Sequence, residues 1–227
     1  MANFKKILDS VYQIGGSQLS DPADCSIYLA KVGPCESVMI DCGAGNSYHE
    51  IIQNINKIGL KPEGLKALIL THCHIDHIGS AYKFKNQFGC DIIAHQKDAN
   101  AIEGRDVEKT AAAWYNVEYK PVIIDTIISG DLLKQRIGEM EFNFIHTPGH
   151  TPGSISVYCN IEGKGVLFGQ DIHGPFDPSF GSDIAAWKNS MQKLLRLEAD
   201  ILCEGHFGVY QPKEEVRRYI EGYLSKY

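Results

Sequence analysis

The sequence has no hydrophobic run long enough to cross a membrane. A spanning helix needs roughly 20 consecutive apolar residues, and no stretch of the 227 residues approaches that length. The first residues, Met-Ala-Asn-Phe-Lys-Lys, also lack the apolar core of a secretory signal peptide. We therefore expect a cytoplasmic protein without a membrane partner.

The cysteines form no recognisable pattern. Seven are scattered along the chain and none belongs to a C-x-x-C pair, which argues against a disulfide framework and against a cysteine zinc site. Most lie in apolar runs typical of strands, where a free cysteine behaves as a small buried hydrophobe. We expect these thiols to be structural.

Basic residues are fewer than acidic ones. The chain has 22 Lys and Arg residues against 28 Asp and Glu residues, a formal net charge of −6 and a pI near 5.8. This balance argues against a nucleic-acid partner, although a local basic patch would not appear in the total, and favours a small-molecule substrate. The length and a hydrophobic content of 44% suit a single globular domain over residues 1–227, whose oligomeric state stays open.

One cluster of metal-binding residue types follows an apolar run over residues 67–70. In an extended segment alternate side chains point the same way, so the first two histidines can reach one ion while Cys73 points away into the core. The next two residues of the cluster can serve a second ion. Imidazole and carboxylate suit Zn²⁺, with iron or manganese as alternatives. The four residues lie within a span of six: His72, His74, Asp76 and His77.

Further ligand candidates follow later strands. His150 lies in a Thr-Pro-Gly-His-Thr-Pro-Gly-Ser segment, whose prolines and glycines predict a tight, rigid loop. Asp171 ends an apolar run, and its two oxygens could bridge two ions. His206 follows the last predicted strand. Asp41 could orient a ligating histidine or act as a helix cap or surface residue, and His146 could be a packed histidine or orient a ligand.

Hydrophobic periodicity predicts alternating strands and helices, hence a layered α/β fold. Gly59 and Pro62 end the first helix, and Gly89 ends the second. Strands are predicted at residues 10–16, 26–32, 37–42, 67–70, 91–95, 122–128, 140–145, 154–159, 165–168 and 201–206, and helices at 47–58, 78–88, around 107–115, from 183 onward and at 213–227.

Two segments interrupt the alternation and are the candidates for substrate contacts. Residues 96–120 carry Trp114, Tyr115 and Tyr119, which could wall a substrate pocket but are expected to anchor the segment on the core. Residues 174–182 are rich in Gly, Pro, Phe and Ser and predict a mobile loop over the site. His173, just before that loop, could contact substrate but is expected to be an exposed loop histidine.

The order of these motifs resembles the metallo-β-lactamase superfamily, most closely its glyoxalase II-like branch. The resemblance implies an αβ/βα four-layer sandwich, two mixed sheets flanked by helices, with a dinuclear metal site at one edge. It implies two divalent metal ions, which we expect to be Zn²⁺, with Asp171 bridging them. It also implies that one metal ion is bound by His72, His74 and His150 and the other by Asp76, His77 and His206.

Two differences narrow the branch. Flavodiiron relatives carry a glutamate at the position of His74, which disfavours reduction of oxygen or nitric oxide. Glyoxalase II enzymes carry a helical extension that binds glutathione, and the 21 residues after His206 are too few to supply it. We therefore expect a glyoxalase II-like hydrolase without the C-terminal helical domain and without glutathione specificity.

The expected reaction is hydrolysis of an ester, thioester or lactone. Two ions that share a water lower its pKa, so that a hydroxide can attack a carbonyl carbon, with Asp76 holding the hydroxide and taking its proton. Three alternatives stay open. They are a mononuclear iron persulfide dioxygenase, a phosphodiesterase or nuclease of the same superfamily, and a binding or sensing protein that keeps the metals without turnover.

Overall fold

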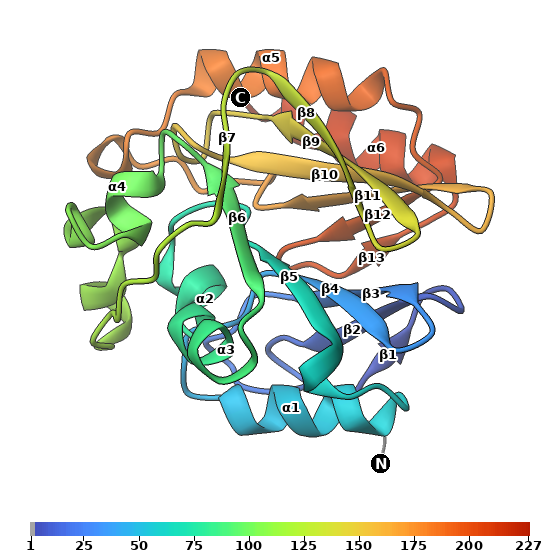
Figure 1. The fold of residues 1–227 in the computed structure, drawn as a ribbon. Helices are drawn as coiled ribbons and strands as arrows, with labels where there is room; N and C mark the ends of the chain where they lie inside the picture. Colours follow the sequence, from blue (N-terminus) through green and yellow to red (C-terminus); the bar gives the residue numbers. More distant parts are fainter. Residues whose placement is uncertain (1–2) are drawn as a thin grey trace.

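In the computed structural model, which describes residues 3–227, the strands form two sheets that face each other (Figure 1). The first sheet is mixed, because β4, β5, β6 and β7 run parallel while the earlier neighbours are antiparallel. Its strands follow the order of the chain: β1 (Lys5–Lys6), β2 (Val11–Gly15), β3 (Ile27–Gly33), β4 (Glu36–Ile40), β5 (Leu65–Ile69), β6 (Asp91–His95) and β7 (Thr126–Ile128).

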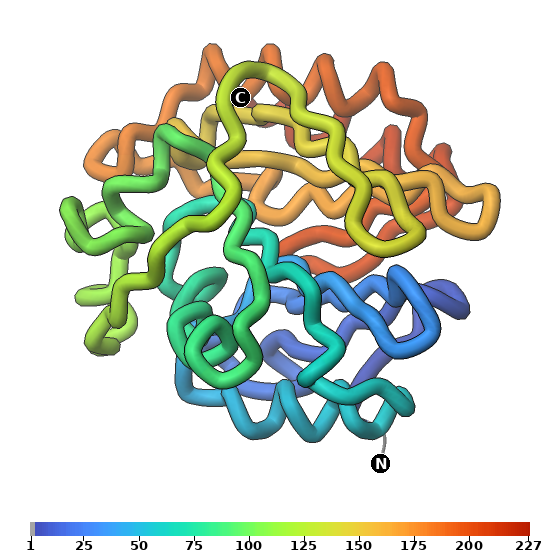
Figure 2. Tube along the Cα trace, in the orientation of Figure 1, coloured from blue at the N-terminus to red at the C-terminus, as the bar shows by residue number. Residues whose placement is uncertain are grey.

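The second sheet is also mixed. Only β11 and β12 pair in parallel, and the other neighbours are antiparallel. The chain passes once from the first sheet to the second, so the blue-to-green and the yellow-to-red halves of Figure 2 occupy separate layers. The spatial order is β13 (Val209–Tyr210), β12 (Ile201–Glu204), β11 (Lys164–Gln170), β10 (Ile155–Ile161), β9 (Met140–His146) and β8 (Leu132–Ile137).

Helices cover the outer face of each sheet. Figure 1 shows α1, α2 and α3 below the first sheet and α5 and α6 above the second, so the predicted four-layer sandwich of two mixed sheets between helices is confirmed. The α-helices are α1 (Tyr48–Lys57), α2 (Ile75–Ile78), α3 (Ala81–Phe88), α4 (Ala99–Ile102), α5 (Ile184–Leu195) and α6 (Lys213–Leu224). Four short 3₁₀ helices complete the set: η1 (Pro62–Gly64), η2 (Val107–Thr110), η3 (Ala112–Tyr115) and η4 (Pro178–Phe180).

Alternation along the strands builds three hydrophobic layers. Successive side chains of a strand point to opposite faces, so in β5 Leu68 packs toward the outer helices while Ile69 packs between the sheets. In β11 Leu167 packs against α5 and α6, and Phe168 packs between the sheets. Because both faces of the central strands are buried, their sequences read as continuous apolar runs.

The topology brings the ends of several strands to one edge of the sandwich. Parallel pairing places the carboxyl ends of β4, β5 and β6 together in the first sheet. In the second sheet β9 is antiparallel to β10, which is antiparallel to β11, so the carboxyl ends of β9, β11 and β12 also share an edge. Four ligand candidates lie within a few residues of the carboxyl end of one of these strands: His72, His150, Asp171 and His206. The other three, His74, Asp76 and His77, lie at the start of α2 or within it.

Some sequence predictions need correction. The helix expected around 107–115 is two 3₁₀ turns, because Ala111 adopts a left-handed φ of 57° between them. The helix at 78–88 is divided into α2 and α3, and the strand at 122–128 is confined to β7. Strand β8 was not predicted, because its residues alternate between exposed and half-buried positions without a buried face.

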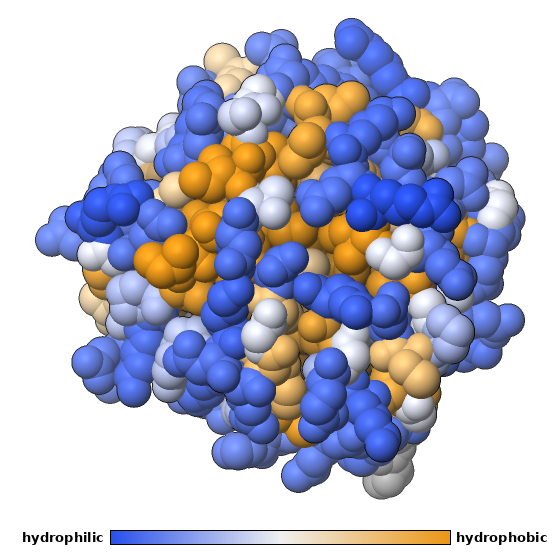
Figure 3. All heavy atoms as spheres, in the orientation of Figure 1, coloured by the Kyte–Doolittle hydropathy of each residue, from blue (hydrophilic) through white to orange (hydrophobic). Residues whose placement is uncertain are grey.

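The open edges of both sheets leave apolar side chains at the surface. Ile127 of β7 and Leu132 of β8 are each 52% exposed. Figure 3 shows hydrophobic atoms gathered in a band across the face on which these strands lie, between hydrophilic regions. Of the seven cysteines only Cys35 is exposed, so the burial expected of Cys73 is confirmed. None of the helices within residues 3–227 has the length and apolarity needed to span a bilayer.

Candidate metal centre

Three histidine rings converge at the edge of the sandwich. His72 and His74 follow β5, with His72 in a bend and His74 in extended backbone, and His150 comes from the loop after β9. His74 Nδ1 lies 3.1 Å from His72 Nε2 and 2.8 Å from His150 Nε2. In a tetrahedral zinc site with bonds of about 2.0–2.1 Å, neighbouring nitrogens lie about 3.3 Å apart. The three nitrogens are therefore close to the spacing of three ligands of one ion.

A second group lies beside the first. His74 is the N-cap of α2, so Asp76 and His77 fall on the first turn of that short helix. Asp76 Oδ2 lies 3.5 Å from His77 Nε2 and 3.3 Å from His206 Nε2. These side chains come from two sheets and meet only because β5 and β12 end at the same edge.

Asp171 lies between the two groups. Its Oδ2 is 3.5 Å from His150 Nε2 and 3.3 Å from His206 Nε2, while its Oδ1 is 3.4 Å from His77 Nε2. The structure thus brings all seven predicted ligand residues together around one carboxylate. Three groups of ligand atoms close enough to share an ion come from these residues: His72, His74 and His150, then Asp76, His77 and His206, and also His72, His77 and Asp171. A fourth group is formed by Cys25, Asp41 and His77.

Hydrogen bonds orient the rings. Asp41 Oδ2 accepts from His77 Nδ1 at 2.7 Å, and the carbonyl oxygen of Pro175 accepts from His150 Nδ1 at 2.7 Å. Thr71 Oγ1 lies 3.2 Å from His72 Nδ1 and donates to Asp41 Oδ2. These bonds hold the protons on Nδ1 and leave each Nε2 lone pair facing the centre, as metal binding requires. Of the roles considered for Asp41, orienting a histidine is the one that the structure shows.

Unpaired atoms support the fit of a cation. His77 Nε2 and Asp171 Oδ1 are buried and have no hydrogen-bond partner among the described residues. Leaving such atoms unpaired costs about 1–3 kcal/mol each, and more for a charged group. A divalent cation between them would satisfy both, so the donor set fits such an ion.

The charges of the two groups differ. Burial, with the neighbouring histidines, holds the pKa of His72 well below its usual value and lowers the pKa of His74 to about 3, so these rings are neutral. Burial also lowers the pKa of His206, but Asp171 and Asp76 outweigh it and raise that pKa to about 10. Without a cation, the acidic side of the centre therefore holds protons that a metal ion would replace.

Two glycines let the His150 loop close. Gly149 has a φ of 150°, and a Cβ there would collide with Trp187. A Cβ on Gly153 would collide with the carboxylate of Asp98, whose oxygens accept hydrogen bonds from the amides of Gly153 at 2.7 Å and Cys73 at 3.0 Å. Asp98 thereby ties the loop that carries His150 to the segment that carries His72.

Asp98 was missed by the sequence analysis. It is buried and also accepts from Thr151 Oγ1 at 2.7 Å. The signal available in the sequence was its place just after β6, a strand parallel to β5, where its carboxylate reaches the same edge as the metal ligands.

A cavity of about 390 Å³ opens onto the centre. Its lining combines ligand candidates, among them Asp76, Asp171, His150 and His206, with several aromatic side chains. The expectation that all three aromatics of residues 96–120 anchor the core is wrong for Trp114, which is 67% exposed, and Tyr115, and both line the cavity. It is confirmed for Tyr119, which is buried with its hydroxyl donating to the carbonyl of Ile102.

The remaining histidines have different places. His173 is not an exposed loop residue: its side chain is 11% exposed, its Nδ1 lies 2.6 Å from Oε1 of the buried Glu204, and it lines the cavity. His146 lies outside the centre and stacks on His95 with ring centroids 4.0 Å apart. The 174–182 loop does cover the site, since Phe180 packs against His74 and Pro175 contacts His150.

Comparison with known proteins agrees with this geometry. Residues 20–206 match the model of the metallo-β-lactamase superfamily. The probable metallo-hydrolase YqgX of Bacillus subtilis (strain 168) is 32% identical over 169 residues, which are 71% of this chain and 76% of that protein. A probable metallo-hydrolase of Methanocaldococcus jannaschii is 27% identical over 179 residues, 75% of this chain and 82% of that protein.

Solved structures share the fold. A subclass B3 metallo-β-lactamase of Bradyrhizobium japonicum superposes with a TM-score of 0.81 at 19% identity, covering 99% of this chain and 91% of the other. A HARLDQ-motif mutant of the metallo-β-lactamase of Cronobacter sakazakii gives a TM-score of 0.81 at 20% identity, covering 98% and 94%. At such identities the likeness shows the fold alone, whereas the match over residues 20–206 shows the family. The chain belongs to the metallo-β-lactamase superfamily.

Proposed function

We propose that the protein is a hydrolase that holds two divalent metal ions and cleaves a carbonyl ester-type bond, in an ester, thioester or lactone, of a small molecule. The observation that carries the proposal is the position of Asp171. Its two oxygens face histidine nitrogens of both ligand groups at 3.3–3.5 Å. A carboxylate in that position suits a bridge between two ions better than it suits a site for one.

The proposed ligands follow the two geometric groups, with Asp171 shared between the ions. Three neutral imidazoles favour Zn²⁺ at the first position, and the mixed carboxylate and imidazole set of the second also accepts iron or manganese. The first ion is assigned to His72, His74 and His150, and the second to Asp76, His77 and His206.

Divalent ions at this centre would lower the pKa of a bound water and polarise a substrate carbonyl. The protein's own contribution is positioning. Asp76 both belongs to the second ligand group and lines the cavity, so its carboxylate can hold the attacking water and accept its proton. Asp41 and Pro175 hold the rings of His77 and His150 in place, so the centre does not have to reorganise when substrate binds.

A substrate panel on metal-loaded protein tests the proposal. It contains a thioester, a lactone, a 4-nitrophenyl ester, a β-lactam, bis-4-nitrophenyl phosphate, and a persulfide with oxygen uptake as the readout. We expect turnover of one of the first three classes, lost on chelation and restored by added zinc. Turnover confined to the phosphodiester would favour a nuclease, and oxygen uptake with one iron per chain would favour a persulfide dioxygenase. Either result overturns the proposal.

A further inference from the structure

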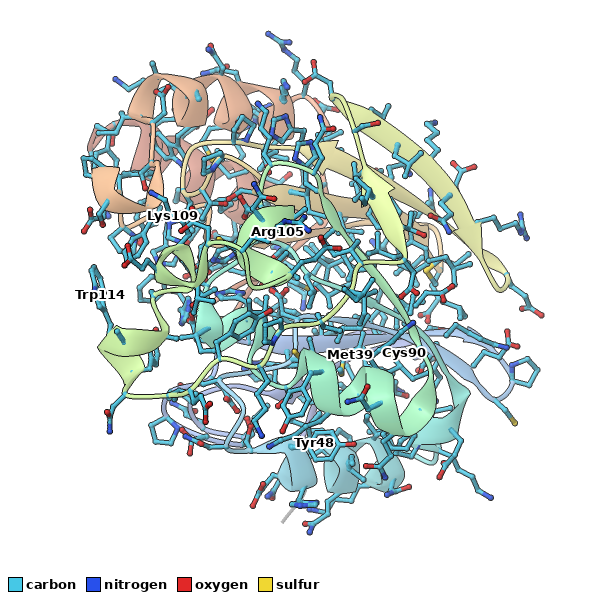
Figure 4. All side chains as sticks on the ribbon, turned by 60° about the vertical axis from the view of Figure 1, so that its left-hand side comes forward. Met39, Tyr48, Cys90, Arg105, Lys109 and Trp114 are labelled. Carbon is cyan, nitrogen blue, oxygen red and sulfur yellow. The ribbon has the colours of Figure 1, made fainter. Side chains whose placement is uncertain are left out.

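The first wall of the cavity is aromatic and fixed in place. Trp114 of η3 packs edge-on against Phe180 of η4, with ring centroids 4.8 Å apart. The preceding η2 is also joined to η4, because the ammonium of Lys109 donates to the carbonyl of Ser179. Figure 4 shows Trp114 at the periphery of the molecule, on the same segment as Lys109. An indole held at the mouth of a cavity offers apolar contact area to a ligand.

A second aromatic part of the cavity lining, Phe207, comes from the segment after β12. Phe207 is 57% exposed, and its ring lies edge-on to His173 at 4.7 Å. The buried Glu204 fixes both residues, because Oε1 bonds His173 Nδ1 and Oε2 accepts from the backbone amide of Phe207 at 2.7 Å. Phe207 is therefore held in place by a rigid support, and its exposed ring offers apolar surface to a ligand in the cavity.

Apart from the proposed metal centre, the described residues of the cavity offer no permanently charged basic side chain to an anionic group. Among the residues that the structure describes, no lysine or arginine lines it, and its acidic residues are Asp76, Asp171 and Asp177. The nearby Lys109 is engaged with Ser179. A substrate carboxylate or phosphate held away from the proposed metal ions would find no lysine or arginine to pair with, and burying an unpaired charge is costly.

From the aromatic lining, and from the lack of lysine and arginine in it among the described residues, we infer that the substrate carries an uncharged, apolar acyl or aryl group that contacts Trp114 and Phe207. This inference rests on the proposed function, since it describes the substrate of the same centre. It excludes glutathione thioesters and other substrates with an anionic group at the cavity mouth. The scissile carbonyl would lie over the metal ligands, with the apolar group in contact with the aromatic lining.

Two matched esters test the inference by turnover. 4-Nitrophenyl hexanoate and the 4-nitrophenyl monoester of adipic acid have acyl chains of equal carbon number, and only the second ends in a carboxylate. We expect kcat/KM for the neutral ester to exceed that for the charged ester by about tenfold or more. From acetate to hexanoate, kcat/KM should rise roughly three- to fourfold for each methylene that enters the cavity.

Variants separate the walls from the chemistry. Trp114→Ala and Phe207→Ala should each lower kcat/KM for the hexanoate about tenfold more than they lower it for the acetate. Ile127→Ala, at an exposed position on β7, is the control and should change neither value. Equal losses for acetate and hexanoate in the wall variants would contradict the inference.

A binding measurement keeps the inference distinct from the proposed function. Hexyl phenyl ether and 5-phenoxypentane-1-sulfonate cannot be hydrolysed, and they differ in charge. Trp114 is the exposed member of the two tryptophans, since Trp187 is buried, so its fluorescence reports occupancy, with Trp114→Phe as the blank. We expect the ether to bind saturably, with a Kd that Phe207→Ala raises about tenfold. The sulfonate should bind the wild type about tenfold more weakly than the ether does.

The outcomes are separable. Tighter binding of the sulfonate, or an unchanged Kd in Phe207→Ala, overturns the inference whatever the enzyme hydrolyses. Binding of the ether without hydrolysis of any ester by the metal-loaded protein would instead overturn the proposed function and leave the apolar site standing.

Discussion

Asp41 Oδ2 lies 2.7 Å from His77 Nδ1, and both side chains are fully buried. The same carboxylate accepts from the amide and hydroxyl of Thr71 and from Gln170 Nε2. It therefore links β4, the end of β5 and the end of β11 at the point where the metal ligands begin. The orientation of His77 is a consequence of this network and not of the histidine's own helix.

Replacing Asp41 should weaken the second metal. Asp41→Asn keeps the size of the side chain and tolerates the φ of 59° at this position. An amide can turn its NH₂ toward His77 Nδ1, which moves the imidazole proton to Nε2 and blocks it as a ligand. We expect a 10–100-fold loss of affinity, about the usual cost of removing such a partner, measured by competition with a chelator. Asp91→Asn at an exposed position is the control, and equal affinity in both variants would contradict this role.

Replacing Asp76 should abolish hydrolysis. Asp76→Ala removes both a ligand of the second ion and the group that holds the attacking water, so a loss in kcat of roughly 10²–10⁴ is expected. Circular dichroism and the melting temperature of the apo-protein should show that the fold is retained. Full activity with both metals bound would remove Asp76 from the mechanism.

Asp98 should matter for stability more than for chemistry. Burial raises the pKa of its carboxyl group, against the hydrogen bonds from Thr151, Gly153 and Cys73 that stabilise the charged form. In Asp98→Asn one amide hydrogen must face a backbone donor, so we expect the free energy of unfolding to fall by about 2–3 kcal/mol in urea titrations. Asp91→Asn is the control variant, and an equal urea midpoint for the two variants would show that Asp98 does not tie the loops together.

The stacked pair of His95 and His146 predicts acid sensitivity outside the metal centre. Burial and the neighbouring His146 lower the pKa of His95 to about 4, although the Gly130 hydrogen bond and Asp131 oppose the shift. The unfolded chain therefore binds more protons between that value and the ordinary histidine pKa, so stability falls as the pH drops through this window.

The test compares wild type with His95→Gln. From pH 7 to pH 5 the apo wild type should lose about 2 kcal/mol more of its unfolding free energy than the variant, as the lowered pKa implies. His49→Gln, on the exposed face of α1, should behave like wild type. If the unfolding free energy falls equally with pH in His95→Gln and in the wild type, His95 is not the source of the acid sensitivity.

Much of the fold could be predicted because the central strands are buried on both faces and form continuous apolar runs. Strand β8 could not, because Leu132 and Lys134 are exposed while Leu133 is half-buried, a pattern shared with loops. The break at Ala111 was equally hidden, because alanine is a good helix former and the tertiary context forces its φ positive.

The candidate site divides in the same way. The grouping of His72, His74, Asp76 and His77 is visible in the sequence because local spacing alone brings them together. The role of Asp98 depends on a contact with Gly153, 55 residues away, and that of Asp41 on one with His77, 36 residues away. The exposure of Trp114 was mispredicted because an aromatic residue beside a cavity and one in a core have the same local sequence features.

Metal analysis of the purified protein tests the central claim most directly. After zinc loading and desalting, elemental analysis should give two ions per wild-type chain, and His206→Ala should give one, since His206 belongs only to the second ligand group. Asp91→Asn, at the exposed start of β6, should keep both. One ion or none in the wild type, or two in His206→Ala, would contradict a dinuclear centre built by these seven side chains.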